Sequence, residues 1–342
     1  MEMRAAVCRA FGEPLVVEDV VLERPGLGEL AVEVAACAIC HSDIIYAEGG
    51  WGGGVPAVYG HEAAGTVVKA GEGVSGFRPG DHVVVTLIRS CGVCPACAQG
   101  TPVTCETRFP LDARSPLRRP NGQPLAQGLR TAAFAERVVV ESSQAVLVPK
   151  SLPLDSASLL ACGVITGFGA VTNTAAMLPG ASAVVIGAGG VGLNTIQGAV
   201  ISGARIVVAL DIVDAKLAAA RRFGATHALR ADNAGVVEEV RRLCGGRGAD
   251  YVFVAVGARP AYAQAVGMAA RSGAVVLVGI PASGVTVEID PGNIAADNQR
   301  ILGSKMGGAC SGRSRRDRFG QARRSVAQRR RLPVKGPGHR CG

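Results

Sequence analysis

Short runs of β-branched and other apolar residues, broken by Gly and Pro, fill the first 160 residues of the chain. Segments such as "ERPGLGE" and "FRPGD" separate one run from the next. Short strands at this spacing are typical of an all-β sandwich or barrel. We therefore expect a barrel-like β domain, with strands within 3–10, 15–23, 30–39, 63–71, 81–87 and 134–141.

After Gly163 the pattern changes to strands that alternate with helices. The apolar run "SAVVIG" predicts a buried strand, and "GGVGLNTIQGAVISG" behind it predicts a helix. Such alternation builds a parallel doubly wound sheet. We expect strands at 182–187, 205–211, 251–257 and 273–280, with helices at 189–203, 215–224 and 260–271. The Pro- and Arg-rich segment 111–130 is expected to be a loop.

Length and composition fit a soluble two-domain protein. The chain has 342 residues, of which 48% are hydrophobic and 18% charged, and domains average about 150 residues. No apolar run reaches the roughly 18 residues of a membrane span. The first twenty residues carry acids among the apolar ones, unlike a secretory signal. We therefore expect a cytoplasmic protein whose eleven cysteines serve as metal ligands rather than disulfides.

The net charge of +9 comes from one segment. Residues 309–342 contain ten Arg, one Lys and one Asp, whereas residues 1–308 contain 25 basic and 26 acidic residues. The body of the chain is close to neutral, so its composition does not suggest a nucleic-acid-binding protein.

The run "CGVCPACAQGTPVTC" places four cysteines at C-x2-C-x2-C-x7-C spacing: Cys91, Cys94, Cys97 and Cys105. Four thiolates in one short lobe suit a closed tetrahedral structural zinc. A ferredoxin cluster is the competing interpretation, but its last spacing is shorter.

A second set of metal ligands is spread along the chain. Cys40 lies in "CAICHSD", His61 in "YGHEAAG" and Cys162 in "LLACGVITG", where the β pattern gives way to the α/β pattern. Three protein ligands and an open position make a catalytic zinc. Taken singly, each residue also suits a buried core position; the thiol-rich stretch and a following cofactor motif favour the metal.

The segment "VVIGAGGVG" places Gly187, Gly189 and Gly192 in a G-x-G-x-x-G pattern after a strand and before a helix, the context of a dinucleotide site. Such glycines let backbone N–H groups approach a pyrophosphate at the helix N-terminus. Asp211 ends the next strand, where a carboxylate accepts hydrogen bonds from the ribose and favours NAD over NADP. A turn residue is the alternative for Asp211.

These three motifs, in this order, resemble the zinc-dependent alcohol dehydrogenases of the medium-chain dehydrogenase/reductase family. The resemblance covers residues 1 to about 308. It implies a GroES-like β-rich catalytic domain at 1–162 and a Rossmann NAD-binding domain at 163–308, an α/β and β fold overall. It also implies a homodimer or homotetramer.

The resemblance further implies residue roles. Cys40, His61 and Cys162 match the catalytic zinc ligands, and Glu62 matches a carboxylate behind the metal that ligates it transiently. Asp43 matches the acid that orients the histidine, and Ser42 the hydroxyl that takes the alcohol proton. The four cysteines of the lobe match the structural zinc site. Cofactor contacts are implied for His41, Thr166, Gly187, Gly189, Gly190, Val191, Gly192, Asp211, Lys216, Val278 and Ile280.

The implied reaction is oxidation of a primary or secondary alcohol to an aldehyde or ketone, with hydride transfer to NAD. Many relatives end their proton relay in a histidine three residues after the hydroxyl, where this chain has Ile45. A glutathione-dependent formaldehyde dehydrogenase is an alternative, because Arg114, Arg118, Arg119 and Arg130 could bind an anionic substrate. Solvated basic side chains are the simpler interpretation of those arginines. A sorbitol- or threonine-type relative is less favoured by the full cysteine set.

The chain departs from the family after "ILGSKMGG". Residues 309–342 are rich in Arg and poor in apolar residues, so we expect a disordered tail. They replace the segment with which the family returns to its catalytic domain. We interpret the tail as the product of a reading-frame shift, because arginine-rich text is typical of a GC-rich gene read out of frame. A non-catalytic NAD-binding chain with a nucleic-acid-binding tail is the alternative function.

Overall fold

The computed structural model describes residues 1–308, which belong to one compact unit. The interpretation of residues 309–342 as a disordered, frame-shifted tail lies outside the described residues. Within the described part, no single helix is long and apolar enough to cross a membrane. One bent pair, Leu154–Ala161 with Gly163–Thr174, passes by length and composition alone.

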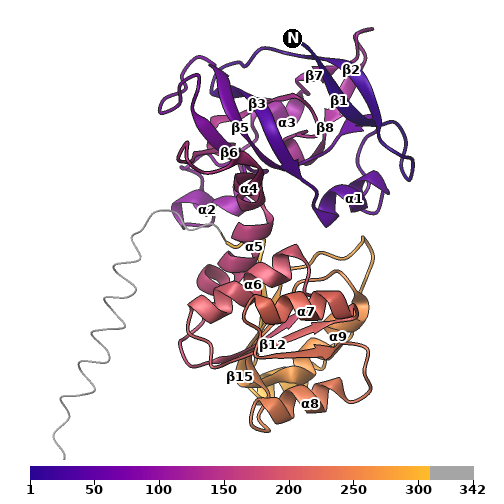
Figure 1. Ribbon diagram of the computed structural model, residues 1–342, viewed down its shortest axis with the longest axis vertical. Coiled ribbons are helices and arrows are strands. Elements are labelled where there is room, and N and C mark those ends of the chain that lie inside the picture. The colour runs from indigo at the N-terminus through magenta and orange to yellow at the C-terminus, as the bar shows by residue number, and fades with distance from the viewer. Residues whose placement is uncertain (309–342) are drawn as a thin grey trace, which may run out of the picture. The chain divides into compact units, whose positions relative to one another are not determined.

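The N-terminal half consists of a closed barrel and a five-stranded antiparallel sheet (Figure 1). The barrel order is β1 (Glu2–Cys8), β2 (Val16–Leu22), β7 (Leu117–Arg118), β8 (Pro124–Gln127) and β4 (Ala57–Val58). The sheet order is β10 (Ala145–Leu147), β6 (His82–Val85), β5 (Glu62–Ala70), β3 (Glu29–Ala38) and β9 (Arg137–Glu141). All six strands expected from the sequence are present, which confirms the barrel-like β domain.

Short helices connect these strands and lead into the second half. The α-helices are α1 (His41–Ala47), α2 (Pro95–Ala98), α3 (Pro110–Ala113), α4 (Leu154–Ser158) and α5 (Gly163–Gly169). Single helical turns are η1 (Pro102–Thr104), η2 (Gly128–Arg130), η3 (Ser142–Gln144), η4 (Leu159–Ala161) and η5 (Ala170–Thr174).

The C-terminal half is a six-stranded parallel sheet. Its order is β13 (His227–Arg230), β12 (Ile206–Asp211), β11 (Ser182–Ile186), β14 (Ala249–Val254), β15 (Ala269–Leu277) and β16 (Arg300–Gly303). Its helices are α6 (Gly190–Ile201), α7 (Asp214–Arg222), α8 (Val236–Leu243), α9 (Arg259–Met268) and α10 (Pro291–Ala296). This 3-2-1-4-5-6 order is the one expected for a doubly wound dinucleotide-binding sheet.

Alternate residues of the central strands feed two separate cores. On one face Val185 and Phe253 pack with Ile196 of α6. On the other face Val184 and Val252 pack in the cluster that α8 and α9 complete. Burial on both faces explains why β11 and β14 are continuous apolar runs rather than alternating ones.

The expectation of a loop at 111–130 was wrong. The segment contains α3 and a β7–β8 hairpin, in which Leu117 pairs with Leu125 and both side chains are fully buried. An Asn121-Gly122 turn joins the strands, with Gly122 at φ +86°, as such turns require. Burial of the two leucines in the barrel core stabilises the hairpin despite its short strands.

The expected helix at 260–271 was too long. It ends at Met268, and Ala269 starts β15 by pairing with Ala249. Ser272 then turns the chain at φ +60°. Strand pairing of buried alanines therefore outweighs their helix propensity, a weak preference that tertiary contacts commonly override.

Candidate active site

Four potential metal ligands converge in the described structure. The ligand atoms of Cys40, His61, Glu62 and Cys162 all lie within 4.8 Å of one another. Cys40 precedes α1, His61 and Glu62 stand at the start of β5, and Cys162 precedes α5. Segments more than 100 residues apart in sequence thus bring the expected ligand set together.

Asp43 fixes the orientation of the His61 ring. Its Oδ1 lies 3.0 Å from His61 Nδ1 and accepts the Gly60 N–H at 3.0 Å. Its Oδ2 accepts the Cys40 N–H at 3.0 Å. The opposite ring nitrogen, His61 Nε2, is buried without a hydrogen-bond partner among the described residues. A buried nitrogen without a partner costs free energy, and a metal ion held in this cluster would satisfy it.

Cys40 is a thiolate at neutral pH, whereas Cys162 keeps its proton. A hydrogen bond from Cys162 lowers the pKa of Cys40 to about 3, and the same bond raises the pKa of Cys162. Burial lowers the pKa of His61, but the hydrogen bond to Asp43 and the negative charges of Asp43 and Cys40 outweigh it and raise the value to about 10. Burial raises the pKa of Glu62 to about 7. Two thiolates and one imidazole are a donor set of catalytic zinc sites. Zinc binding would release the protons of Cys162 and His61, so the residues fit zinc.

The other residues of the first motif lie on α1. Ser42 is half-buried and His41 is exposed. Ile45 packs towards the turn after the helix, since a Cβ on Gly50 would lie 2.9 Å from Ile45 Cγ2. Ile45 therefore serves as a packing residue, and its side chain has no group that can transfer a proton.

The four cysteines of the lobe form a second cluster, with all Sγ atoms within 4.8 Å of one another. The Cys94 N–H donates to Cys91 Sγ at 3.2 Å, and the Cys91 N–H donates to Cys105 Sγ at 3.4 Å. A hydrogen bond from Thr107 lowers the pKa of Cys91 to about 6, whereas burial raises that of Cys97 to about 12. Four thiols without a free position fit a structural zinc.

The glycine-rich turn has two kinds of glycine. Gly187 has φ +96°, and a Cβ on Gly192 would lie 1.7 Å from Gly187 O, so both are required by the close approach of α6 to β11. Gly189 and Gly190 instead face open space, with no atom within 4 Å of an added Cβ. Open backbone at the N-terminus of a 12-residue helix fits a pyrophosphate.

Asp211 stands at the end of β12 beside this turn. Its Oδ2 accepts the Ala188 N–H at 2.8 Å and its Oδ1 accepts the Val213 N–H at 3.0 Å. Each oxygen retains acceptor capacity for a ribose hydroxyl. Lys216 is exposed on the first turn of α7.

The residues expected beside a nicotinamide differ in burial. Thr166 on α5 and Val278 after β15 are buried, at 7% and 6% exposure. Val191 is half-buried on α6, whereas Ile280 is 56% exposed. Thr166 Oγ1 lies 3.7 Å from Cys162 Sγ. Helix α5 therefore connects the metal cluster with the residues expected beside a nicotinamide.

The sequence reasoning missed Met306, whose Sδ lies 3.5 Å from Cys162 Sγ and 3.6 Å from Thr166 Oγ1. It also missed Arg89, which is 2% exposed. The Arg89 guanidinium donates to Gln144 Oε1 at 2.9 Å, Asp112 Oδ1 at 2.8 Å, Gln127 Oε1 at 2.8 Å and Arg130 O at 2.9 Å. Neither residue belongs to a spaced motif, so no sequence signal separated them from ordinary core and surface residues.

Comparisons with known proteins agree with this geometry. Two family models match: an alcohol dehydrogenase GroES-like domain at residues 26–150 and a zinc-binding dehydrogenase domain at 190–326. Together they define a two-domain zinc-binding dehydrogenase.

Individual relatives are similar over most of their length. A putative alcohol dehydrogenase D of Mycobacterium tuberculosis is 34% identical, over 90% of this chain and 85% of its own. An S-(hydroxymethyl)glutathione dehydrogenase of Paracoccus denitrificans is 34% identical, over 90% and 86%. The crystal structure of benzyl alcohol dehydrogenase from Acinetobacter calcoaceticus has a TM-score of 0.85 at 27% identity, covering 95% of this chain and 90% of that one.

The chain therefore belongs to the zinc-dependent alcohol dehydrogenases of the medium-chain dehydrogenase/reductase family. The expected GroES-like domain combined with a Rossmann-type sheet is confirmed. Its cofactors are zinc and NAD(P), and its activity is zinc-dependent alcohol oxidation.

Proposed function

We propose that this chain oxidises a primary or secondary alcohol with NAD as the hydride acceptor, at a site formed by Cys40, His61 and Cys162. The observation that carries the proposal is the unpartnered, buried Nε2 of His61, within 4.8 Å of the ligand atoms of Cys40 and Cys162. Zinc bound there supplies a Lewis acid that lowers the pKa of an alcohol.

The protein's own groups do the remaining work. Cys40 and Cys162 would ligate the metal as thiolates, and Asp43 orients the imidazole so that Nε2 is free to ligate. Ser42 accepts the alcohol proton and passes it outward. Ile45 cannot continue the relay, because its side chain has no ionisable group. Thr166 and Val191 would hold the nicotinamide ring beside the metal cluster.

The second half binds the cofactor in this proposal. Gly189 and Gly190 leave room for the pyrophosphate, with His41 beside it, and Asp211 binds the adenosine ribose with Lys216 nearby. The Asp211 carboxylate repels a 2′-phosphate, which is why we propose NAD over NADP. Val278 and Ile280, which follow β15, would line the nicotinamide.

We propose the working division of the chain at residue 162, with the catalytic domain at 1–162 and the cofactor domain at 163–308. The Cys91, Cys94, Cys97 and Cys105 lobe binds a structural zinc. Glu62 would be a transient ligand of the catalytic metal. We further propose a cytoplasmic homodimer or homotetramer that acts on a small alcohol or aldehyde and has no nucleic-acid partner.

The glutathione-linked alternative gains no support from the arginines around the β7–β8 hairpin. Arg114 pairs with Glu23 at 2.9 Å and with Glu29 at 2.6 Å. Arg118 and Arg119 also pair with carboxylates of β2 or its end, and Arg130 Nε lies 3.3 Å from Asp112 Oδ1. These charges stabilise the barrel rather than present a free basic loop.

The test is NAD reduction by the purified chain with ethanol, benzyl alcohol and S-(hydroxymethyl)glutathione. Turnover of either simple alcohol that a zinc chelator abolishes supports the proposal. Turnover of the glutathione adduct alone would replace it with the glutathione-dependent activity.

A further inference from the structure

Arg89 is a buried charge just before the four-cysteine lobe. Its side chain is 1% exposed, and its ion-pair partner among the described residues is Asp112, at 2.8 Å. Its other hydrogen bonds go to neutral oxygens of Gln144, Gln127 and Arg130. Burying a charge costs free energy unless the charge is paired and hydrogen-bonded. One guanidinium therefore holds four acceptors from different segments in place.

One of these acceptors, the carbonyl of Arg130, belongs to a strained turn formed by Leu129, Arg130 and Ala132. Their φ values are 50°, 60° and 60°, a left-handed conformation that costs non-glycine residues free energy and persists where surrounding contacts enforce it. Arg89 Nη2 donates to Arg130 O at 2.9 Å, and Gln144 Nε2 donates to the same oxygen at 3.1 Å. Since Arg89 Nε also holds Gln144 Oε1 at 2.9 Å, both donors depend on one guanidinium.

The residues after the strained turn pack tightly against those before His61. The Ala133 N–H donates to Gly60 O at 2.9 Å, and the Phe134 N–H donates to Tyr59 O at 2.9 Å. A Cβ on Gly60 would lie 2.6 Å from Phe134 N, so the two backbones meet without room for a side chain. A displacement of the strained turn is therefore transmitted to Gly60.

Gly60 connects this packing with the metal cluster. The Gly60 N–H donates to Asp43 Oδ1 at 3.0 Å, and the same oxygen lies 3.0 Å from His61 Nδ1. His61 is also the next residue of the chain. The place of its Nε2 therefore depends on the Gly60 backbone, whereas Arg89 is not one of the four residues of the cluster.

Resting on the proposed catalytic zinc site, we propose that Arg89 is a positioning residue for that site. Its guanidinium holds the strained turn, the strained turn places the backbone that contacts Gly60, and Gly60 places the imidazole of His61. The planar guanidinium is suited to this role because it presents five donors in fixed directions. An ammonium group or an apolar side chain at position 89 does not hold the same four acceptors.

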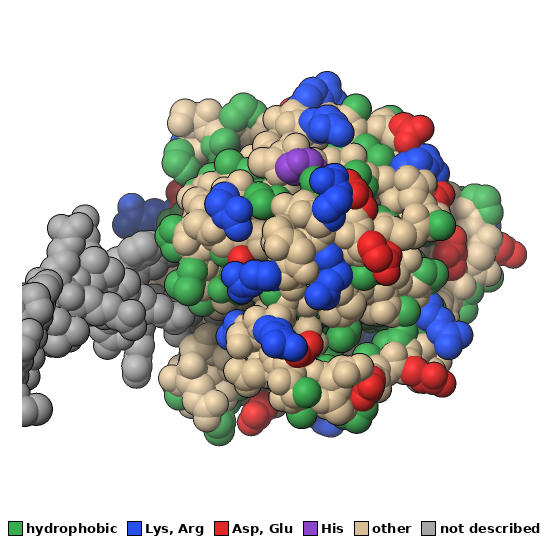
Figure 2. Space-filling view, turned by 90° about the horizontal axis from the view of Figure 1, so that it is seen from below, with side chains coloured by type: hydrophobic (Ala, Val, Ile, Leu, Met, Phe, Trp, Pro, Cys, Tyr) green, Lys and Arg blue, Asp and Glu red, His purple; other side chains and the backbone are tan. Residues whose placement is uncertain are grey.

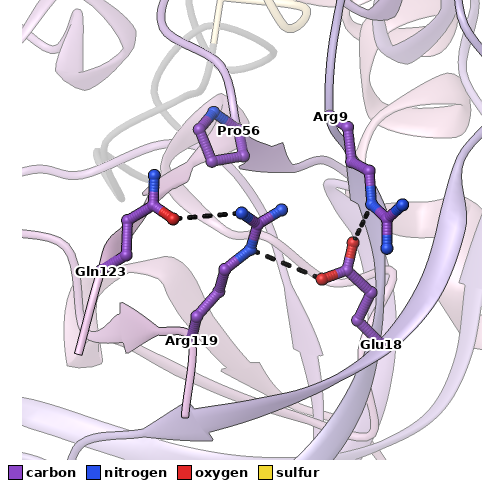
Figure 3. A pocket seen from close by; sticks show the side chains of 5 residues that line it. All are labelled: Arg9, Glu18, Pro56, Arg119 and Gln123. Carbon is purple, nitrogen blue, oxygen red and sulfur yellow. Dashed lines mark hydrogen bonds and ion pairs between the residues drawn. The ribbon is translucent and has the colours of Figure 1, made fainter. Parts of the chain in front are cut away.

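A second arginine of the same half of the protein provides a matched control. Arg119 Nη1 donates to Gln123 Oε1 at 3.1 Å, and its Nε lies 3.4 Å from Glu18 Oε2 (Figure 3). It therefore has a glutamine and a carboxylate as partners, as Arg89 does. Arg119 borders an open pocket of about 600 Å³, and no hydrogen bond among the described residues joins its side chain to the strained turn.

The test measures zinc binding by the intact chain and by Arg89→Met, through dialysis against graded chelator and metal analysis. We expect the zinc affinity of the Cys40, His61 and Cys162 site to fall by about tenfold or more, the usual effect of losing a support behind a ligating histidine. The four-cysteine lobe should keep its ion, and Arg119→Met should keep both affinities. Unchanged affinity of the catalytic site in Arg89→Met would overturn the inference, as would loss of the lobe's zinc alone.

A second substitution separates this role from a general loss of stability. Glycine adopts a positive φ without steric cost, so Arg130→Gly should keep the strained turn in place without Arg89. We expect Arg89→Met combined with Arg130→Gly to recover most of the lost zinc affinity. Arg89→Met combined with Arg130→Ala removes the same side chain but keeps the backbone strain, and it should recover none. Recovery in both double variants, or in neither, would overturn the coupling through the turn.

Amide hydrogen exchange follows the intermediate step without counting metal. We expect the N–H groups of Gly60, Ala133 and Phe134 to exchange faster in Arg89→Met, because local opening depends on the contacts that hold a segment. The amides of the central strand β11 should keep their protection. Unchanged exchange at the three amides, or faster exchange throughout the chain, would overturn the inference.

Arg89→Lys carries the same prediction should Arg89→Met not fold. Its ammonium keeps a charge beside Asp112 but lacks the fork of donors, so the zinc affinity of the catalytic site should again fall; full affinity would overturn the inference. Alcohol turnover tests the proposed function separately. A chain that binds two zinc ions, loses affinity in the Arg89 variants and oxidises no alcohol would end the proposed function and leave this inference standing. A chain that binds one zinc ion would overturn both.

Discussion

His61 Nδ1 lies 3.0 Å from Asp43 Oδ1, and this single contact determines which ring nitrogen faces the two thiols. Both side chains are almost fully buried. Because Nδ1 is engaged, Nε2 is the only ring nitrogen left to ligate a metal. The same carboxylate also holds the Gly60 and Cys40 N–H groups, so Asp43 connects two of the three proposed ligands.

Replacing Asp43 with Asn should weaken the catalytic zinc site. We expect its zinc affinity to fall by about 10- to 100-fold, the usual effect of losing a carboxylate behind a ligating histidine. The measurement is zinc content by mass spectrometry after dialysis against graded chelator. Asp232→Asn, which alters only a surface ion pair with Arg230, is the control. Equal zinc retention in the two variants would contradict the role of Asp43.

Replacing Cys105 with Ser should remove the structural zinc and lower Tm. The four-thiol lobe has only short helical turns of its own, so the metal holds it together. We expect zinc per chain to fall from two to one. Cys37→Ser, outside both metal clusters, should keep both ions; a chain that keeps two zincs without Cys105 would refute the assignment.

Two glycines of the dinucleotide turn should respond differently to the same substitution. Gly192→Ala places Cβ 1.7 Å from Gly187 O, so we expect a clear loss of Tm. Gly189→Ala meets no protein atom within 4 Å, so Tm should be unchanged while NAD binds more weakly. Thermal denaturation and NAD titration measure the two effects. Equal NAD affinity in Gly189→Ala and the unmodified chain would argue against a cofactor at this turn.

Asp211→Asn should relax the preference for NAD over NADP. The substitution keeps the size of the side chain and removes the charge that opposes a 2′-phosphate. We expect the ratio of kcat/KM values to fall by about tenfold or more, about 1.4 kcal/mol. Steady-state kinetics with both cofactors measure the ratio. Lys216→Met, which removes a neighbouring positive charge, shows how far a general change of charge alters the ratio. An unchanged ratio in Asp211→Asn would show that the cofactor selectivity lies elsewhere.

The features that the sequence predicted best are the ones with strong local signals. The strand before Gly187 and the helix after it combine a fully apolar run with glycine spacing, and both are present. The Cys91 to Cys105 lobe was predictable because its four ligands lie within 15 residues. The third ligand of the other cluster, Cys162, lies 101 residues after His61. It was connected with His61 only through its place where the β pattern gives way to the α/β pattern and through the resemblance to a family.

What could not be predicted depends on contacts between distant segments. The β7–β8 hairpin could not be predicted from its own sequence, because the burial of Leu117 and Leu125 in the barrel stabilises it. Met306 reaches Cys162 because Gly307 approaches α5 closely, where a Cβ would lie 2.0 Å from Ile165 O.

Basic side chains in the view of Figure 2 are interspersed with acidic and hydrophobic ones, consistent with the near-neutral composition of residues 1–308.

The central claim is that zinc held by Cys40, His61 and Cys162 is required for alcohol oxidation. The most direct test removes zinc from the purified chain, restores it in steps, and follows NAD reduction by benzyl alcohol, with Cys162→Ser in parallel. We predict that activity returns in proportion to the second zinc bound per chain, and that Cys162→Ser stays inactive while still binding NAD. Full turnover by the zinc-free chain, or by Cys162→Ser, would contradict the account.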